Sequence, residues 1–94
     1  MNETMEIQRI AADELAGMYT VAESCWRVFC LIDGQNLNEV VSGLPQPLRD
    51  DFTGWAHRTF ANDRNRAEFL SVRGADHPHF EEALAAVRAW LAFG

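Results

Sequence analysis

The segment RVFCLIDGQNLNEVV, residues 27–41, decides the fold because it permits two incompatible interpretations. An apolar run closed by Asp33-Gly34 is typical of a buried strand that ends at an acidic turn. It is also typical of the last turns of a long helix that Gly34 ends in the left-handed conformation. The first interpretation predicts an α+β fold with a strand at 26–32, and the second predicts an all-α fold.

The residues before this segment favour the helix. Apolar residues recur at the three-and-four spacing of one helical stripe; they are Leu15, Met18, Tyr19, Ala22, Cys25, Trp26, Phe29 and Ile32. A strand that began at Trp26 would leave this pattern without a stop signal. We therefore predict one helix from Ala11 to about Ile32. Its last turn is apolar all round, so we expect it to be deeply buried or covered by a second copy of the chain.

Further helices are predicted downstream. Asn36 or Asn38 can cap a short helix that runs through Val41. Pro47 is well placed to begin the next helix, whose apolar stripe is Leu48, Phe52, Trp55, Ala56, Thr59 and Phe60. A short helix is expected from about Asn65 to Val72.

The last predicted helix is capped by Asp76 and has Pro78 in its first turn. Its buried face is expected to be Phe80, Ala83, Leu84, Val87, Trp90 and Leu91. The sequence thus predicts one domain over residues 1–94, folded as an all-α bundle of four to five helices.

Composition excludes several classes of protein. The chain has 94 residues, 48% of them apolar, and a formal net charge of −6. Binding to nucleic acid or to anionic membrane depends on excess positive charge, so we expect neither. No apolar run approaches the roughly 18 to 20 residues that span a bilayer, and the N-terminus does not resemble a signal peptide. A cytoplasmic location is the expectation.

The positive charges gather in one segment. Residues 57–73 carry Arg58, Arg64, Arg66 and Arg73, whereas the rest of the chain is acidic. Arginine forks and helix N-termini both recognise oxyanions, so this set could hold the phosphates of a nucleotide or cyclic dinucleotide. The simpler interpretation is that these arginines form surface ion pairs of little energetic value.

A nuclease is the remote alternative. The stretch FCLIDGQNL resembles the first strand of NYN and PIN-like nuclease domains, in which an apolar strand delivers an Asp to a divalent metal. The resemblance implies that Asp33 and Asn36 would serve a metal-dependent hydrolysis of phosphodiesters. The rest of the sequence shows neither a second strand ending in Asp nor an alternation of strands and helices.

Other catalytic or metal-binding patterns are weak. His77 and His79 lie beside a helix start, where they are expected to be exposed, and Cys25 and Cys30 are expected to be buried thiols. The serines occupy no strand-turn-helix elbow. The sequence therefore predicts no enzyme, no metal and no cofactor.

An interaction protein is what remains. Its acidic surface would suit a protein partner with a basic surface and would speed association by long-range attraction. The predicted partner-binding residues are Asp50, Asp51, Glu81 and Glu82. Immunity proteins, antitoxins and phage-encoded inhibitors of host defence have roles of this kind. The apolar run at 28–32 also predicts a homodimer.

Overall fold

The all-α prediction is confirmed by the computed structural model, which describes residues 3–60, 64, 67 and 77–93. The helices in these ranges are α1 (Glu3–Leu15), α2 (Val21–Phe29), α3 (Leu37–Gly43), α4 (Leu48–Phe60) and α6 (Phe80–Phe93). No strand occurs among the described residues, so the alternative interpretation of 26–32 as a strand is wrong. The helix expected at 65–72 lies, apart from Ala67, outside the residues described.

The prediction of a single long helix across residues 11–32 is also wrong, because the chain divides into α1 and α2 at Gly17. This glycine has a φ of +75°. Its N–H donates to the carbonyl of Glu14, and the N–H of Met18 donates to the carbonyl of Asp13. The two bonds form a Schellman motif, which ends a helix at a left-handed glycine. Both helices are amphipathic, and the apolar spacing continues across the break. The spacing alone therefore predicted one helix where there are two.

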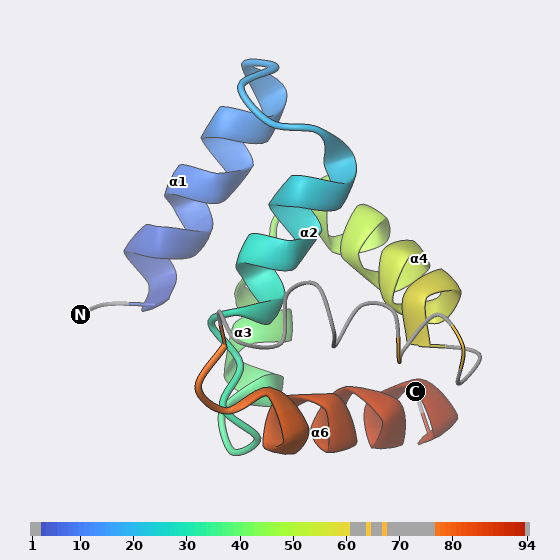
Figure 1. Ribbon diagram of the computed structural model, residues 1–94. Helices are drawn as coiled ribbons and strands as arrows, with labels where there is room; N and C mark the ends of the chain where they lie inside the picture. Colours follow the sequence, from blue (N-terminus) through green and yellow to red (C-terminus); the bar gives the residue numbers. More distant parts are fainter. Residues whose placement is uncertain (1–2, 61–63, 65–66, 68–76, 94) are drawn as a thin grey trace.

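Thr20 then begins the second helix. Its hydroxyl accepts the N–H of Glu23 at 3.1 Å, the usual arrangement of a helix N-cap. The chain reverses between the two helices, so α1 and α2 lie side by side, joined by a loop at the top of Figure 1. α4 packs against α2, and α6 crosses below them.

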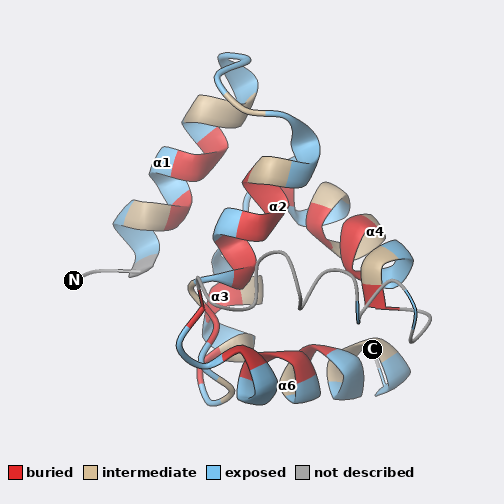
Figure 2. Cartoon of the chain, viewed as in Figure 1, coloured by how far each residue is buried: buried red, intermediate tan, exposed pale blue. Residues whose placement is uncertain are grey.

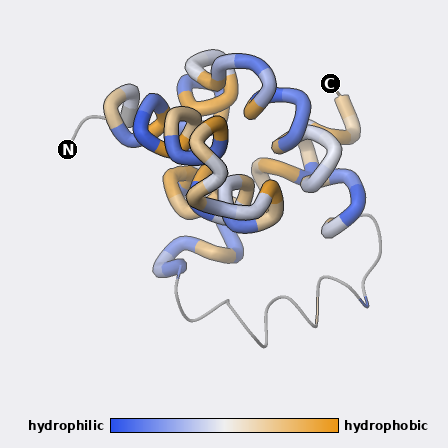
Figure 3. The backbone as a smooth tube through the Cα atoms, turned by 90° about the horizontal axis from the view of Figure 1, so that it is seen from above, coloured by the Kyte–Doolittle hydropathy of each residue, from blue (hydrophilic) through white to orange (hydrophobic). Residues whose placement is uncertain are grey.

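Phe29 lies at the centre of the core and is fully buried. Its ring centroid lies 5.2 to 6.2 Å from those of five other rings, which belong to Trp26, Trp55, Phe60, His77 and Phe80. Aromatic pairs at these separations add to the stabilisation from burial. Orange and blue alternate around the helical turns in Figure 3, as expected of helices that share one core.

The apolar run at 28–32 is used by this core. Val28, Phe29 and Ile32 have no exposed surface. They therefore offer nothing to a second copy of the chain, and the homodimer prediction loses the observation on which it was based. Cys30 is exposed, contrary to expectation, whereas Cys25 is buried as predicted.

The two later helices have the buried faces that the sequence predicts. In α4 these residues are Leu48, Phe52, Trp55, Ala56 and Phe60, while Thr59, also predicted in this stripe, is only partly buried. In α6 they are Phe80, Ala83, Leu84 and Val87, with Trp90 and Leu91 partly buried against the core. None of the helices described is long and apolar enough to cross a membrane.

Gly34 has a different role from the one predicted. α2 ends at Phe29, well before Gly34, and its cap residue Cys30 keeps right-handed helical geometry. Gly34 has a φ of +98°, and a Cβ atom placed on it would lie 2.8 Å from the Cβ of Glu82. The glycine thus lets the turn after α2 lie directly against the first turn of α6.

Candidate functional site

The four acids predicted to bind a partner do not form one surface. Asp51 interacts with Glu14 at the end of α1, close to the beginning of α2. Glu82 packs on Gly34, beyond the end of α2. The pairs Asp50-Asp51 and Glu81-Glu82 therefore lie toward opposite ends of α2, and the two ends differ in almost every physical respect.

The first end is the loop between α1 and α2, which exposes large apolar side chains. Leu15 is 71% exposed, Met18 67% and Val21 45%. We call these three residues the tip patch. The pale blue of the upper loop in Figure 2 marks this exposure. Leu15 and Met18 were predicted to belong to a buried stripe, and that prediction is wrong because the break at Gly17 turns them away from the core.

Two polar side chains beside the tip patch, Glu14 and Ser24, lie in unfavourable surroundings. Burial raises the pKa of Glu14, and the charge of Asp51 and a hydrogen bond to it raise that pKa further. The Oε2 atom of Glu14 is buried, and so is the hydroxyl of Ser24; neither has a hydrogen-bond partner among the described residues. Native proteins contain few buried polar atoms without a hydrogen-bond partner, so two of them near one surface need an explanation.

Cys25 lies close to these acids, and its thiol has low reactivity. Burial raises the pKa of its thiol to about 12, and the charges of Glu14 and Asp51 add to the effect. A thiolate is the reactive form of cysteine. Cys25 is therefore a poor nucleophile.

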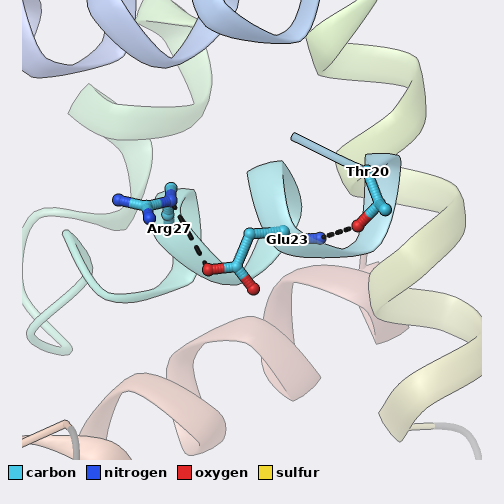
Figure 4. Close-up of polar contacts among 3 residues, drawn as sticks. All are labelled: Thr20, Glu23 and Arg27. Carbon is cyan, nitrogen blue, oxygen red and sulfur yellow. Dashed lines mark hydrogen bonds and ion pairs between the residues drawn. The ribbon is translucent and has the colours of Figure 1, made fainter. Parts of the chain in front are cut away.

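A groove runs between α1 and α2 next to the tip patch. It has a volume of about 370 Å³. In its wall, the guanidinium of Arg27 lies 3.5 Å from the carboxylate of Glu23 and 4.1 Å from the ring centroid of Tyr19. Figure 4 shows Glu23 between its two partners, Thr20 and Arg27. Sequence reasoning missed this groove because it treated the two helices as one.

The second end of α2 is the turn from Asp33 to Asn36, which satisfies its own polar groups. The Asp33 carboxylate accepts the N–H groups of Gln35 and Asn36, at 2.9 and 3.2 Å. The Asn36 side chain accepts the N–H of Asp33 at 3.0 Å and donates to the carbonyl of Leu31 at 2.8 Å. We call this closed set the Asp33–Asn36 turn. Asn36 is thus the residue before α3, as predicted, but its side chain is turned back and does not cap that helix.

These bonds also bear on the nuclease resemblance. Asp33 follows a helical turn and does not end a strand. The pKa of its carboxyl is lowered, first of all by the hydrogen bond from the Gln35 N–H. Its Oδ1 atom already accepts two backbone N–H groups. Among the described residues, no group of three or more His, Cys, Asp and Glu side chains is placed to hold a metal ion.

His77 is a structural residue and is 4% exposed, so the expectation of an exposed side chain is wrong. Its Nε2 lies 3.0 Å from the carbonyl oxygen of Phe29, and its Nδ1 accepts the N–H of His79 at 3.1 Å. Nε2 therefore carries the proton and donates to α2, while Nδ1 serves the start of α6. The side chain ties the two helices together.

The arginine set is described only in part. Arg58 and Arg64 are exposed, and Arg66 and Arg73 lie outside the described residues. The Arg58 side chain folds back along α4, where its Nη1 would lie 3.0 Å from a Cβ placed on Gly54. Gly54 thus leaves room for a side chain of its own helix. Binding of a nucleotide by this segment stays a prediction.

Comparison of the chain with protein-family models, curated proteins and solved structures finds no match. The function must therefore be inferred from the chemistry of the two ends of α2.

Proposed function

We propose that this protein is a small, non-enzymatic interaction protein that binds a basic surface of a larger macromolecular partner through the tip patch. Its role would be to modulate or inhibit that partner, as immunity proteins, antitoxins and phage-encoded anti-defence proteins do. The observation that carries the proposal is the exposure of Leu15, Met18 and Val21 within seven residues of one another in the sequence.

An exposed apolar group of this kind needs an explanation. Single exposed apolar residues are ordinary on protein surfaces, whereas neighbouring ones mark sites of contact. Leu15 and Met18 flank a loop whose backbone is fixed by the Schellman motif. The patch is therefore held in one shape before a partner arrives, which reduces the entropy lost on binding.

The charges around the patch indicate the partner's sign. Asp13, Glu14 and Glu23 come from the helices on either side of the loop, and Asp50 and Asp51 come from the first turn of α4. A partner with positive charge around an apolar recess would complement both parts of this surface. A cation of the partner placed beside Glu14 and Asp51 would also offset the repulsion that, together with burial as the larger cause, raises the pKa of Glu14.

The test compares tagged wild-type protein with the double variant Leu15→Ser, Met18→Ser in affinity capture from the native host. The captured partner should be lost from the variant, while the free energy of unfolding changes by less than about 0.5 kcal/mol per residue because both side chains are exposed. Undiminished capture by a folded variant would refute the proposal.

A matched pair of charge reversals sharpens this experiment. Asp50→Arg and Glu81→Arg both reverse an exposed acid in the first turn of a helix, so both lose a similar interaction with the helix dipole, about 0.5 kcal/mol. Asp50→Arg should weaken capture and make it less sensitive to salt. Glu81→Arg should leave capture unchanged, and the opposite order would place the partner at the other end of α2.

A further inference from the structure

The groove between α1 and α2 has the size of a binding site. Its volume of about 370 Å³ lies within the range of pockets that hold small molecules or single side chains. Tyr19 and Glu23 line it, and they lie within two or three residues of Met18 and Val21 in the tip patch. A partner bound to the tip patch could therefore extend a side chain into the groove.

The groove is apolar at its base and charged along its walls. Ile10 and Trp26 are buried, and Leu31 is half-buried. The charged side chains that line it are the carboxylates of Glu6, Asp13 and Glu23 and the guanidinium groups of Arg9 and Arg27. Such a lining suits a ligand with an apolar body and a charged head.

The balance of charge indicates a cation. Arg27 already interacts with Glu23 and with the ring of Tyr19. On α1, Arg9 lies one helical turn from Glu6 and one from Asp13, so two carboxylates flank a single guanidinium. One negative charge is in excess. An anionic ligand would meet a lining of net negative charge, and a neutral apolar one would remove water from the charged groups without compensation.

We propose that the groove binds a basic side chain of the partner, arginine or lysine, with its aliphatic stem over Ile10 and Trp26 and its charged head between Asp13 and Glu23. Long basic side chains commonly bury their stems while the head remains near water or a carboxylate. This inference rests on the proposed function, because it names the chemical group that the partner would supply.

Cys30 provides a reporter of occupancy. It is exposed and lines the groove, whereas Cys25 is fully buried. A thiol-directed reagent such as iodoacetamide should therefore modify Cys30 and spare Cys25. A side chain bound in the groove should slow that modification.

The experiment uses the full chain and a small probe, N-acetyl-arginine amide, with N-acetyl-citrulline amide as the uncharged control of the same shape. Amide resonances in α1 and α2 should shift saturably with the arginine probe, and alkylation of Cys30 should slow in proportion. The citrulline probe should bind at least about tenfold more weakly, since a charged hydrogen bond contributes more than a neutral one.

Variants locate the site. The double variant Asp13→Asn, Glu23→Gln should weaken the arginine probe at least about tenfold, and Glu39→Gln, which removes an exposed acid from α3, should not change it. Equal binding of citrulline, shifts outside α1 and α2, full affinity in the double variant, or no saturable binding would each overturn the inference. If the probe fails while the tip variants still lose their partner, the groove proposal falls and the proposed function stands. If the probe binds but the tip variants keep their partner, the reverse holds.

Discussion

The two ends of α2 differ in whether their polar and apolar side chains find partners within the chain. At the Asp33–Asn36 turn, the polar groups pair with one another and Gly34 lets α6 pack directly on the turn. At the loop between α1 and α2, apolar side chains are exposed, two carboxyl groups are in contact, and the Ser24 hydroxyl is buried without a partner among the described residues. Proteins break local rules mainly where function requires it. The Asp33–Asn36 turn therefore stabilises the fold, and this contrast is why we propose the loop between α1 and α2 as the surface that contacts a partner.

The largest difference between the two ends is expected when the same substitution, glycine to alanine, is made at both. Gly34→Ala should lower the free energy of unfolding by about 3 kcal/mol, because the positive φ costs 1 to 2 kcal/mol and the added Cβ would overlap Glu82. Gly17→Ala should cost only about 1 kcal/mol, since its φ is also positive but a Cβ there would meet no atom within 4 Å. Urea unfolding of both variants measures the difference, and equal losses would mean that the loop between α1 and α2 is as tightly packed as the Asp33–Asn36 turn.

A smaller effect is expected from the amide that closes the Asp33–Asn36 turn. Asn36→Ala should lower the free energy of unfolding by about 2 kcal/mol, because the Asp33 N–H and the Leu31 carbonyl both lose their partner. The control is Asn38→Ala, an exposed asparagine in the first turn of α3, which should change stability by less than about 0.5 kcal/mol. Similar values for the two variants, measured by thermal and urea unfolding, would show that the turn is not a stabilising element.

At the other end, removing a polar group should stabilise the protein. Ser24→Ala should raise the free energy of unfolding by about 1 kcal/mol, because the buried hydroxyl has no partner among the described residues and alanine favours the helix. Ser42→Ala in α3 is the control, since Ser42 is exposed and gains only the helix propensity of about 0.5 kcal/mol. A loss of stability in Ser24→Ala would indicate that the hydroxyl is bonded after all.

Much of the fold follows from the sequence, and the limits have a clear physical origin. The helical stripes of α4 and α6 were predictable because each apolar face is continuous and Pro47 directly precedes α4. Pro78 lies before α6 and not in its first turn as predicted, and the predicted cap Asp76 lies outside the described residues. The break at Gly17 was not predicted, although glycine is the usual residue at a helix end. The apolar spacing of α1 continues in the same phase in α2. This spacing therefore favoured one continuous helix, although Gly17 is a signal for a helix end.

The tip patch and the groove were harder to predict, because both depend on that break. Leu15 and Met18 look like core residues in a continuous helix and become exposed only when the chain reverses at Gly17. The burial of His77 depends on its contact with Phe29, a residue that lies 48 positions away in the sequence. Composition did predict an acidic surface, but it could not show that Asp51 and Glu82 lie at different ends of α2.

The smallest predicted effect is on pH dependence, and its sign differs between the two ends. The pKa of Glu14 is raised above its ordinary value of 4.5, so its contribution to stability is present below that value and is lost as the pH rises through the folded-state pKa. The pKa of Asp33 is lowered from 3.8, so its contribution is present above that value and is lost as the pH falls through the folded-state pKa.

Two variants isolate these contributions. Relative to Glu14→Gln, the wild-type protein should be more stable at pH 4 than at pH 7, whereas relative to Asp33→Asn it should gain stability as the pH rises from about 2 to 5. Urea unfolding across this range measures both differences. The same sign in both series would contradict the claim that the two ends of α2 affect the pH dependence of stability in opposite directions.

The most direct measurement is site-specific photo-crosslinking in the native host, with p-benzoylphenylalanine placed either at position 18 in the tip patch or at position 35 in the Asp33–Asn36 turn. Both positions are exposed, so both report contact equally well. A discrete adduct with another protein from position 18, and none from position 35, is the predicted result. An adduct from position 35 and none from position 18 would contradict the assignment of the binding surface, and an adduct from position 18 at the mass of two chains would show that the tip patch binds a second copy instead.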